Sequence, residues 1–104
     1  MTTSRKEALL QLLRHDPSDR TSHYMLGNEY FKAQKYVEAV QTLRRYLQFA
    51  DDEGAAYRLL AQSLERLGDL DGARRAYRDG LAAATRHGHQ PLIDEYTQAL
   101  RNLE

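Results

Sequence analysis

Histidine is the side chain of this sequence best suited to general acid–base chemistry or metal binding at neutral pH. Four are present: His15, His23, His87 and His89. His87 and His89 flank a single glycine and could contact one metal ion from a loop, but two ligands fall short of a protein metal site. The sequence has no cysteine, which excludes a thiolate metal site, a cysteine nucleophile and a disulfide scaffold. We therefore expect no metal, no cofactor and no catalytic residue, and a protein that is not an enzyme.

Charged side chains are balanced along the chain. Fifteen Lys and Arg residues offset fifteen Asp and Glu residues, so no overall field draws the protein to nucleic acid or to an anionic membrane. Arginine pairs at 44–45 and 74–75 could face phosphates, but Asp71 and Asp79 dilute their charge. The acidic run at 51–53 precedes an expected helix start, where capping and the helix dipole favour negative charge. We therefore expect a protein or peptide partner, and neither nucleic acid nor a membrane.

The elements that position these side chains repeat with a period of thirty-four residues. The identical pairs are Leu26 and Leu60, Ala39 and Ala73, Arg44 and Arg78, Leu47 and Leu81, and Ala50 and Ala84. A repeat of this length cannot bury its own apolar face and is stable only when stacked on a neighbour. Such stacks typically serve as binding surfaces rather than as catalysts.

Small and apolar residues within the two copies follow a family pattern. They are His23, Leu26, Gly27, Tyr30, Ala39 and Leu43 in the first copy, and Tyr57, Leu60, Ala61, Leu64, Ala73 and Tyr77 in the second. Their spacing resembles the tetratricopeptide repeat, which runs W-x2-L-G-x2-Y, then A-x3-F, then P. Asp51 and Thr85 stand where the closing proline is usual. The resemblance implies an all-α fold, a right-handed α-solenoid of antiparallel helix pairs.

Six helices are expected in a single domain spanning 1–104. The segment 1–19 supplies an incomplete repeat whose helix starts at a capping box, Ser4 to Glu7, and ends near 14. Repeat one (20–53) supplies helices at about 22–33 and 36–50, and repeat two (54–87) supplies helices at about 55–67 and 70–86. Gln34 occupies the turn position that Gly68 holds in the second repeat, where a left-handed backbone favours glycine.

The segment 88–104 is expected to form a capping helix at about 91–103. A third repeat fits only if two residues are inserted before it, because otherwise Asp94 and Glu95 would be buried. The shifted register places four residues at packing positions: Ile93, Tyr96, Thr97 and Leu100.

The resemblance implies that the first helix of each repeat lines a concave groove, and a helical wheel gives the positions of these helices that point away from the packing side. The expected peptide-binding residues are Tyr24, Asn28, Phe31, Lys32, Arg58, Gln62, Glu65 and Arg66. On the capping helix the same positions are Asp94, Gln98, Arg101 and Asn102. The amides could bond a peptide backbone, the two aromatic rings could give apolar contact, and the cations point to an acidic or carboxylate-bearing ligand. The alternative is that these are solvated side chains on an exposed helix face.

Two functions remain open at this point. The first is a non-catalytic adaptor that holds an extended peptide in the groove. The second is a self-associating module that forms a homodimer through its terminal helices, which an uncovered patch at Leu10, Leu92 or Leu103 would favour. A cytoplasmic location is expected, because residues 1–14 contain no apolar run of signal-peptide length and no run approaches the ~20 residues of a membrane span.

Overall fold

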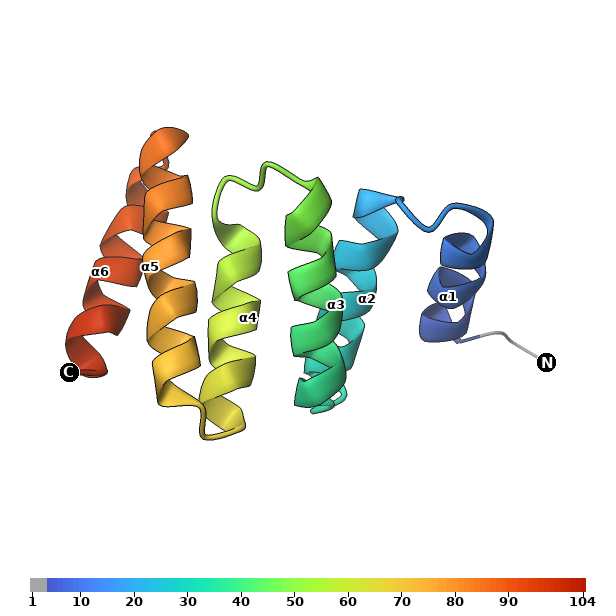
Figure 1. Ribbon diagram of the computed structural model, residues 1–104, viewed down its shortest axis with the longest axis horizontal. Helices are drawn as coiled ribbons and strands as arrows, with labels where there is room; N and C mark the ends of the chain where they lie inside the picture. The colour runs from blue at the N-terminus through green and yellow to red at the C-terminus, as the bar shows by residue number, and fades with distance from the viewer. Residues whose placement is uncertain (1–3) are drawn as a thin grey trace.

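A computed structural model describes residues 4–104, and within that range the chain forms six helices and no strand (Figure 1). The helices are α1 (Arg5–His15), α2 (Arg20–Lys32), α3 (Tyr36–Phe49), α4 (Ala55–Arg66), α5 (Leu70–Arg86) and α6 (Gln90–Asn102). These bounds agree with the predicted helices to within two residues. The prediction of an all-α helical repeat fold is confirmed.

Each helix packs mainly on the helices that precede and follow it in the chain. The resulting body is elongated, measuring 47 × 28 × 19 Å, with α1 and α6 at opposite ends (Figure 1). α2 also contacts α4, so the first helices of successive repeats stack directly. We call the side formed by α2, α4 and α6 the inner face, and the side formed by α1, α3 and α5 the outer face.

Small residues allow the helices to approach closely. A Cβ added at Gly27 of α2 would lie 2.7 Å from Cδ2 of Leu43, which is fully buried on α3. The matching position in the second repeat is Ala61, also fully buried. A Cβ at Gly80 of α5 would lie 2.7 Å from Tyr96 of α6. The contact between Gly27 and Leu43 is the close approach that the repeat pattern predicts.

The two turns inside the repeats share one backbone conformation despite different sequences. Gln34 has φ of 61° and Gly68 has φ of 80°, both in the left-handed region. After Gly68, the Asp69 carboxylate accepts a hydrogen bond from the Gly72 N–H at 2.9 Å and caps α5. The prediction for these turn and cap positions is confirmed.

Two helix starts show how local sequence sets the boundaries. Ser4 Oγ accepts a hydrogen bond from the Glu7 N–H at 3.1 Å, which is the serine half of the expected capping box. α2 begins two residues earlier than predicted, because Asp19 caps it by accepting from the Ser22 N–H at 3.3 Å. Ser22, taken as the first residue of that helix, instead lies inside its first turn.

Exchanging the two turn residues tests the cost of the left-handed backbone. Gln34→Gly should raise the free energy of unfolding by about 0.5–1 kcal/mol, because only a non-glycine residue pays for this conformation. Gly68→Gln should lower it by a similar amount, since no atom lies within 4 Å of an added Cβ and backbone strain is the only cost. Urea unfolding followed by circular dichroism measures both. Equal stabilities for all three proteins would contradict this account.

Filling the close contact between α2 and α3 should destabilise the stack. Gly27→Ala places a methyl group against buried Leu43, and we expect a loss of about 1–3 kcal/mol in the free energy of unfolding. The double variant Gly27→Ala/Leu43→Ala should lose less stability than the sum of the two single losses, because the new methyl group partly fills the cavity left by Leu43. Strict additivity of the two changes would show that the contact is not the cause.

Candidate functional site

An open hollow of about 480 Å³ lies on the inner face between α4 and α6. Its lining includes Arg58 and Gln62 from α4, Gln98 and Asn102 from α6, and Tyr77 of α5. Gln98 Nε2 donates to Asn102 Oδ1 at 3.1 Å, one turn apart on the same helix. Amide side chains carry both donors and acceptors, so this lining can match the main chain of an extended peptide.

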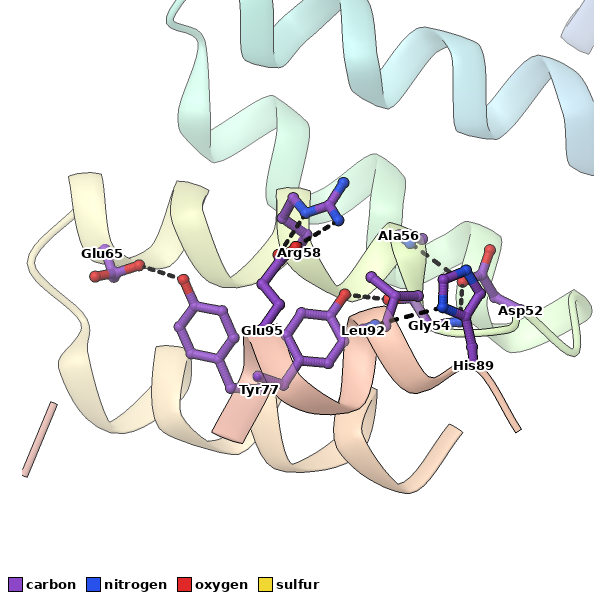
Figure 2. A network of polar contacts seen from close by, with 10 residues as sticks. Asp52, Gly54, Ala56, Arg58, Glu65, Tyr77, His89, Leu92 and Glu95 are labelled. Carbon is purple, nitrogen blue, oxygen red and sulfur yellow. Dashed lines mark hydrogen bonds and ion pairs between the residues drawn. The ribbon is translucent and has the colours of Figure 1, made fainter. Parts of the chain in front are cut away.

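A bidentate ion pair bridges one edge of this hollow. Arg58 Nε and Nη2 donate to the two carboxylate oxygens of Glu95 at 2.6 and 2.7 Å, and Figure 2 shows the pair spanning from α4 to α6. The hydrogen bonds to Glu95 raise the pKa of Arg58. Both side chains are about 40% exposed, so water screens the pair and its contribution to stability is small. The Arg58 charge, predicted to meet a ligand, already has a partner inside the protein.

Two buried tyrosines fix the helices around the hollow. The Tyr77 hydroxyl donates to the Glu65 carboxylate at 2.6 Å and ties α5 to α4. The Tyr96 hydroxyl donates to the Gly54 carbonyl and ties α6 to the start of α4. Burial is the main reason that the pKa of each tyrosine is raised. These bonds set the spacing of α4, α5 and α6, and they occupy Glu65, one of the predicted groove residues.

The acidic run before α4 has a structural role, as its position predicts. Asp52 Oδ1 accepts from the Gly54 N–H at 2.7 Å and from the Ala56 N–H at 3.1 Å, which satisfies orphan donors at the helix start. Asp52 Oδ2 also accepts from the Tyr46 hydroxyl at 2.7 Å. The carboxylate therefore ties the loop to both α3 and α4.

The structure does not gather the predicted groove residues at one place. Arg58 and Gln62 line the hollow between α4 and α6. Tyr24 lines a separate hollow of about 360 Å³, with Arg20 and Tyr46, beside the loop from α3 to α4. The remaining predicted residues line neither hollow: Asn28, Phe31, Lys32, Glu65 and Arg66. Gln98 and Asn102, assigned to the same face of the capping helix, do join Arg58 and Gln62.

The two aromatic residues predicted on the groove are partly covered by α3. Both are half-buried. Tyr24 packs edge-on against Tyr46 with ring centroids 5.3 Å apart, and Phe31 packs edge-on against Tyr36 at 5.7 Å. The guanidinium of Arg66 lies over the Tyr36 ring, 5.9 Å from the ring centroid. α3 therefore supplies aromatic partners for both rings that the helical wheel could not show.

Two of the four histidines have structural roles. His23, predicted to replace the usual buried Trp, is 6% exposed and its Nε2 lies 2.7 Å from the Pro17 carbonyl oxygen. His89 Nδ1 accepts from the Leu92 N–H at the start of α6, a capping role that the sequence reading missed. Residues 4–104 hold no group of three or more His, Cys, Asp or Glu side chains arranged to bind a metal ion.

None of the three leucines considered for self-association is fully exposed. Leu92 is 3% exposed, and Leu10 and Leu103 are half-buried. The apolar side chain most exposed on α1 is Leu12, at 51%. None of the six described helices is both long and apolar enough to cross a bilayer.

Antiparallel helices with a 34-residue period and small residues at their contacts define a helical repeat protein of the tetratricopeptide type. Residues 4–80 match the tetratricopeptide-type family model described as anaphase-promoting complex, cyclosome, subunit 3. The chain belongs to this tetratricopeptide repeat family, whose members form protein-interaction modules.

Two proteins are similar to it over nearly their whole length. The TPR repeat-containing protein PA0015 of Pseudomonas aeruginosa is 32% identical over 98 residues, which cover 94% of this chain and 93% of that protein. The solution structure of protein BPP2914 from Bordetella parapertussis has a TM-score of 0.83 and 30% identity, covering 98% of this chain and 89% of the other.

Because the pKa values of Tyr77 and Tyr96 are raised, the free energy of unfolding should depend on pH in the alkaline range. A folded-state pKa above the ordinary value of 10.0 means that the stabilisation is complete below pH 10 and is lost as pH rises beyond it. The free energy of unfolding should fall above about pH 10 by up to about 1.4 kcal/mol per pH unit for each tyrosine. Tyr77→Phe should be less stable at pH 7 by about 1 kcal/mol but should lose less on going to about pH 11. A slope identical to that of the unaltered chain would contradict the assignment.

Proposed function

We propose that this protein is a non-catalytic adaptor that binds an extended segment of another protein on its inner face, in the hollow between α4 and α6. The observation that carries the proposal is the amide-rich lining of that hollow by Gln62, Gln98 and Asn102. None of these three side chains belongs to the buried core. Membership of a family of interaction modules supports the same function.

The ion pair at the edge of the hollow limits how charge contributes. Glu95 already accepts two hydrogen bonds from Arg58 and offsets its charge, so a ligand carboxylate competes with Glu95 for this guanidinium. Lys32, a second predicted cation, lies 3.9 Å from Glu29 on its own helix. Main-chain hydrogen bonds are therefore the principal source of affinity. An acidic ligand gains additional affinity only where its carboxylate competes with Glu95 for Arg58.

Self-association through the terminal helices is the less supported alternative. It needs an uncovered apolar surface at the ends of the stack, and Leu92 is buried while Leu10 and Leu103 are half-buried. Sedimentation equilibrium at micromolar concentration should give a monomer of 12.0 kDa. A dimer at that concentration would favour the alternative.

Peptide selection with matched variants tests the proposal. Random 12-residue peptides enriched on the protein should bind about tenfold more weakly to Gln62→Ala/Asn102→Ala, because each lost hydrogen bond contributes about 0.5–1.5 kcal/mol. Chemical-shift changes in ¹⁵N-labelled protein should lie on α4 and α6. Gln11→Ala/Gln41→Ala, which removes two exposed amides from α1 and α3, should leave affinity unchanged. If no enriched peptide distinguishes the two double variants, the inner-face assignment fails.

The Arg58–Glu95 pair adds an internal control. Glu95→Gln removes the competing carboxylate while keeping the side-chain shape, so it should tighten the binding of acidic peptides and leave neutral peptides unaffected. Equal effects on both kinds of peptide would show that Arg58 does not meet the ligand.

A further inference from the structure

A hollow of about 550 Å³ opens on the outer face between α3 and α5. α3 and α5 pack on α4 rather than on each other, so α4 forms the floor. The floor includes the buried side chains of Leu60 and Leu64, and the walls include Leu47 of α3 and Ala76 of α5. We call this hollow the outer groove. It is separate from the inner-face hollow and shares none of its lining residues.

The outer groove is a product of the repeat itself. A smaller hollow of about 260 Å³ lies one repeat earlier, over α2 and between α1 and α3. Its lining residues precede those of the outer groove by the same thirty-four positions. The pairs are Leu10 and Arg44, Leu13 and Leu47, His23 and Tyr57, Leu26 and Leu60, Tyr30 and Leu64, Gln41 and Arg75, Thr42 and Ala76, and Arg45 and Asp79. The earlier hollow therefore shows which residues distinguish the outer groove at equivalent positions of the repeat.

The two hollows differ in where their charges lie. Arg44 stands on α3 and Arg75 on α5, where the earlier hollow has Leu10 and Gln41. Both arginines are exposed, and neither takes part in an ion pair within residues 4–104. Asp79 also lines the groove, where the earlier hollow has Arg45, so each hollow has an excess of one positive charge. Only the outer groove has an arginine on each of its two rims. An apolar floor between two guanidinium groups fits a ligand that is aliphatic at its centre and anionic beside it.

We propose that the outer groove is a second docking site, which takes an acidic segment of a partner protein carrying one bulky aliphatic side chain. The aliphatic side chain fills the space above Leu60 and Leu64, and a neighbouring Asp or Glu carboxylate accepts hydrogen bonds from Arg44 and Arg75. Charge complementarity with the two arginines selects this occupant over a neutral peptide. Because the inner face binds a different segment, the protein can then hold two partner segments at the same time.

Counter-selection of a peptide library tests the second site. Random 12-residue peptides displayed on phage are enriched on the unaltered protein and then depleted on Arg44→Leu/Arg75→Gln, which restores the rim residues of the earlier hollow. The surviving peptides should carry Leu, Ile or Met within four residues of Asp or Glu. Their Kd should rise at least about tenfold on the double variant and fall as ionic strength is lowered. Amide shifts should appear at Leu47 and Ala76.

Three control variants separate binding in the outer groove from a general effect of charge and from binding at the inner face. Arg45→Leu/Arg78→Gln removes the same charge from the same two helices outside this groove, and should leave the Kd within about twofold. Arg44→Lys/Arg75→Lys should restore part of the affinity. Gln62→Ala/Asn102→Ala should not change the Kd of these peptides. Failure of the outer-groove proposal can therefore be distinguished from failure of the inner-face proposal. Circular dichroism melts establish that each variant is folded.

Three results would overturn the proposal. The first is a selection that yields no peptide depleted by Arg44→Leu/Arg75→Gln. The second is a set of depleted peptides whose amide shifts lie on α4 and α6 at the inner face. The third is displacement of the peptides by a single-stranded oligonucleotide that binds more tightly than they do, which would assign the arginines to phosphate binding.

Discussion

The whole structure depends on close packing between the first and second helix of each repeat. Isolated helices of 11 to 17 residues are marginal in water, so each must bury an apolar stripe against a neighbour. Gly27 lets Leu43 reach full burial, and Ala61 and Tyr77 hold the same positions one repeat later. A side chain larger than Ala at either small position would separate the helices. The inner-face hollow and the outer groove open between helices that this packing keeps apart.

Polar contacts refine the stack but do not drive it. Tyr77 with Glu65, Tyr96 with Gly54, and Asp52 with the start of α4 connect elements that apolar burial has already brought together. Their directionality fixes the angle between neighbouring helices, which a layer of leucine and alanine leaves adjustable. No buried side-chain oxygen or nitrogen of residues 4–104 lacks a hydrogen-bond partner. The inner face can therefore be rigid while its amide groups remain exposed to a ligand.

The two faces use one architecture for different chemistry. The inner hollow joins α4 to α6 and is lined by amides and an internally paired arginine. The outer groove joins α3 to α5 and combines an aliphatic floor with arginines that have no internal carboxylate partner among residues 4–104. Substitution at equivalent positions of the repeat, such as Leu10 against Arg44, changes the surface without changing the helices. A short stack can thus present two distinct binding chemistries.

The sequence by itself determined the helices, the left-handed turn at Gln34, the buried role of His23 and the family resemblance, because these follow from local spacing and from a period visible in the chain. It also assigned Arg58 and Gln62 to one face of α4, and both line the inner-face hollow. Only the tertiary structure decided that Arg58 meets Glu95, 37 residues away, that Tyr46 and Tyr36 cover Tyr24 and Phe31, and where the hollows open. A helical wheel gives the direction of a side chain but not its neighbours, which depend on the angles and distances between stacked helices.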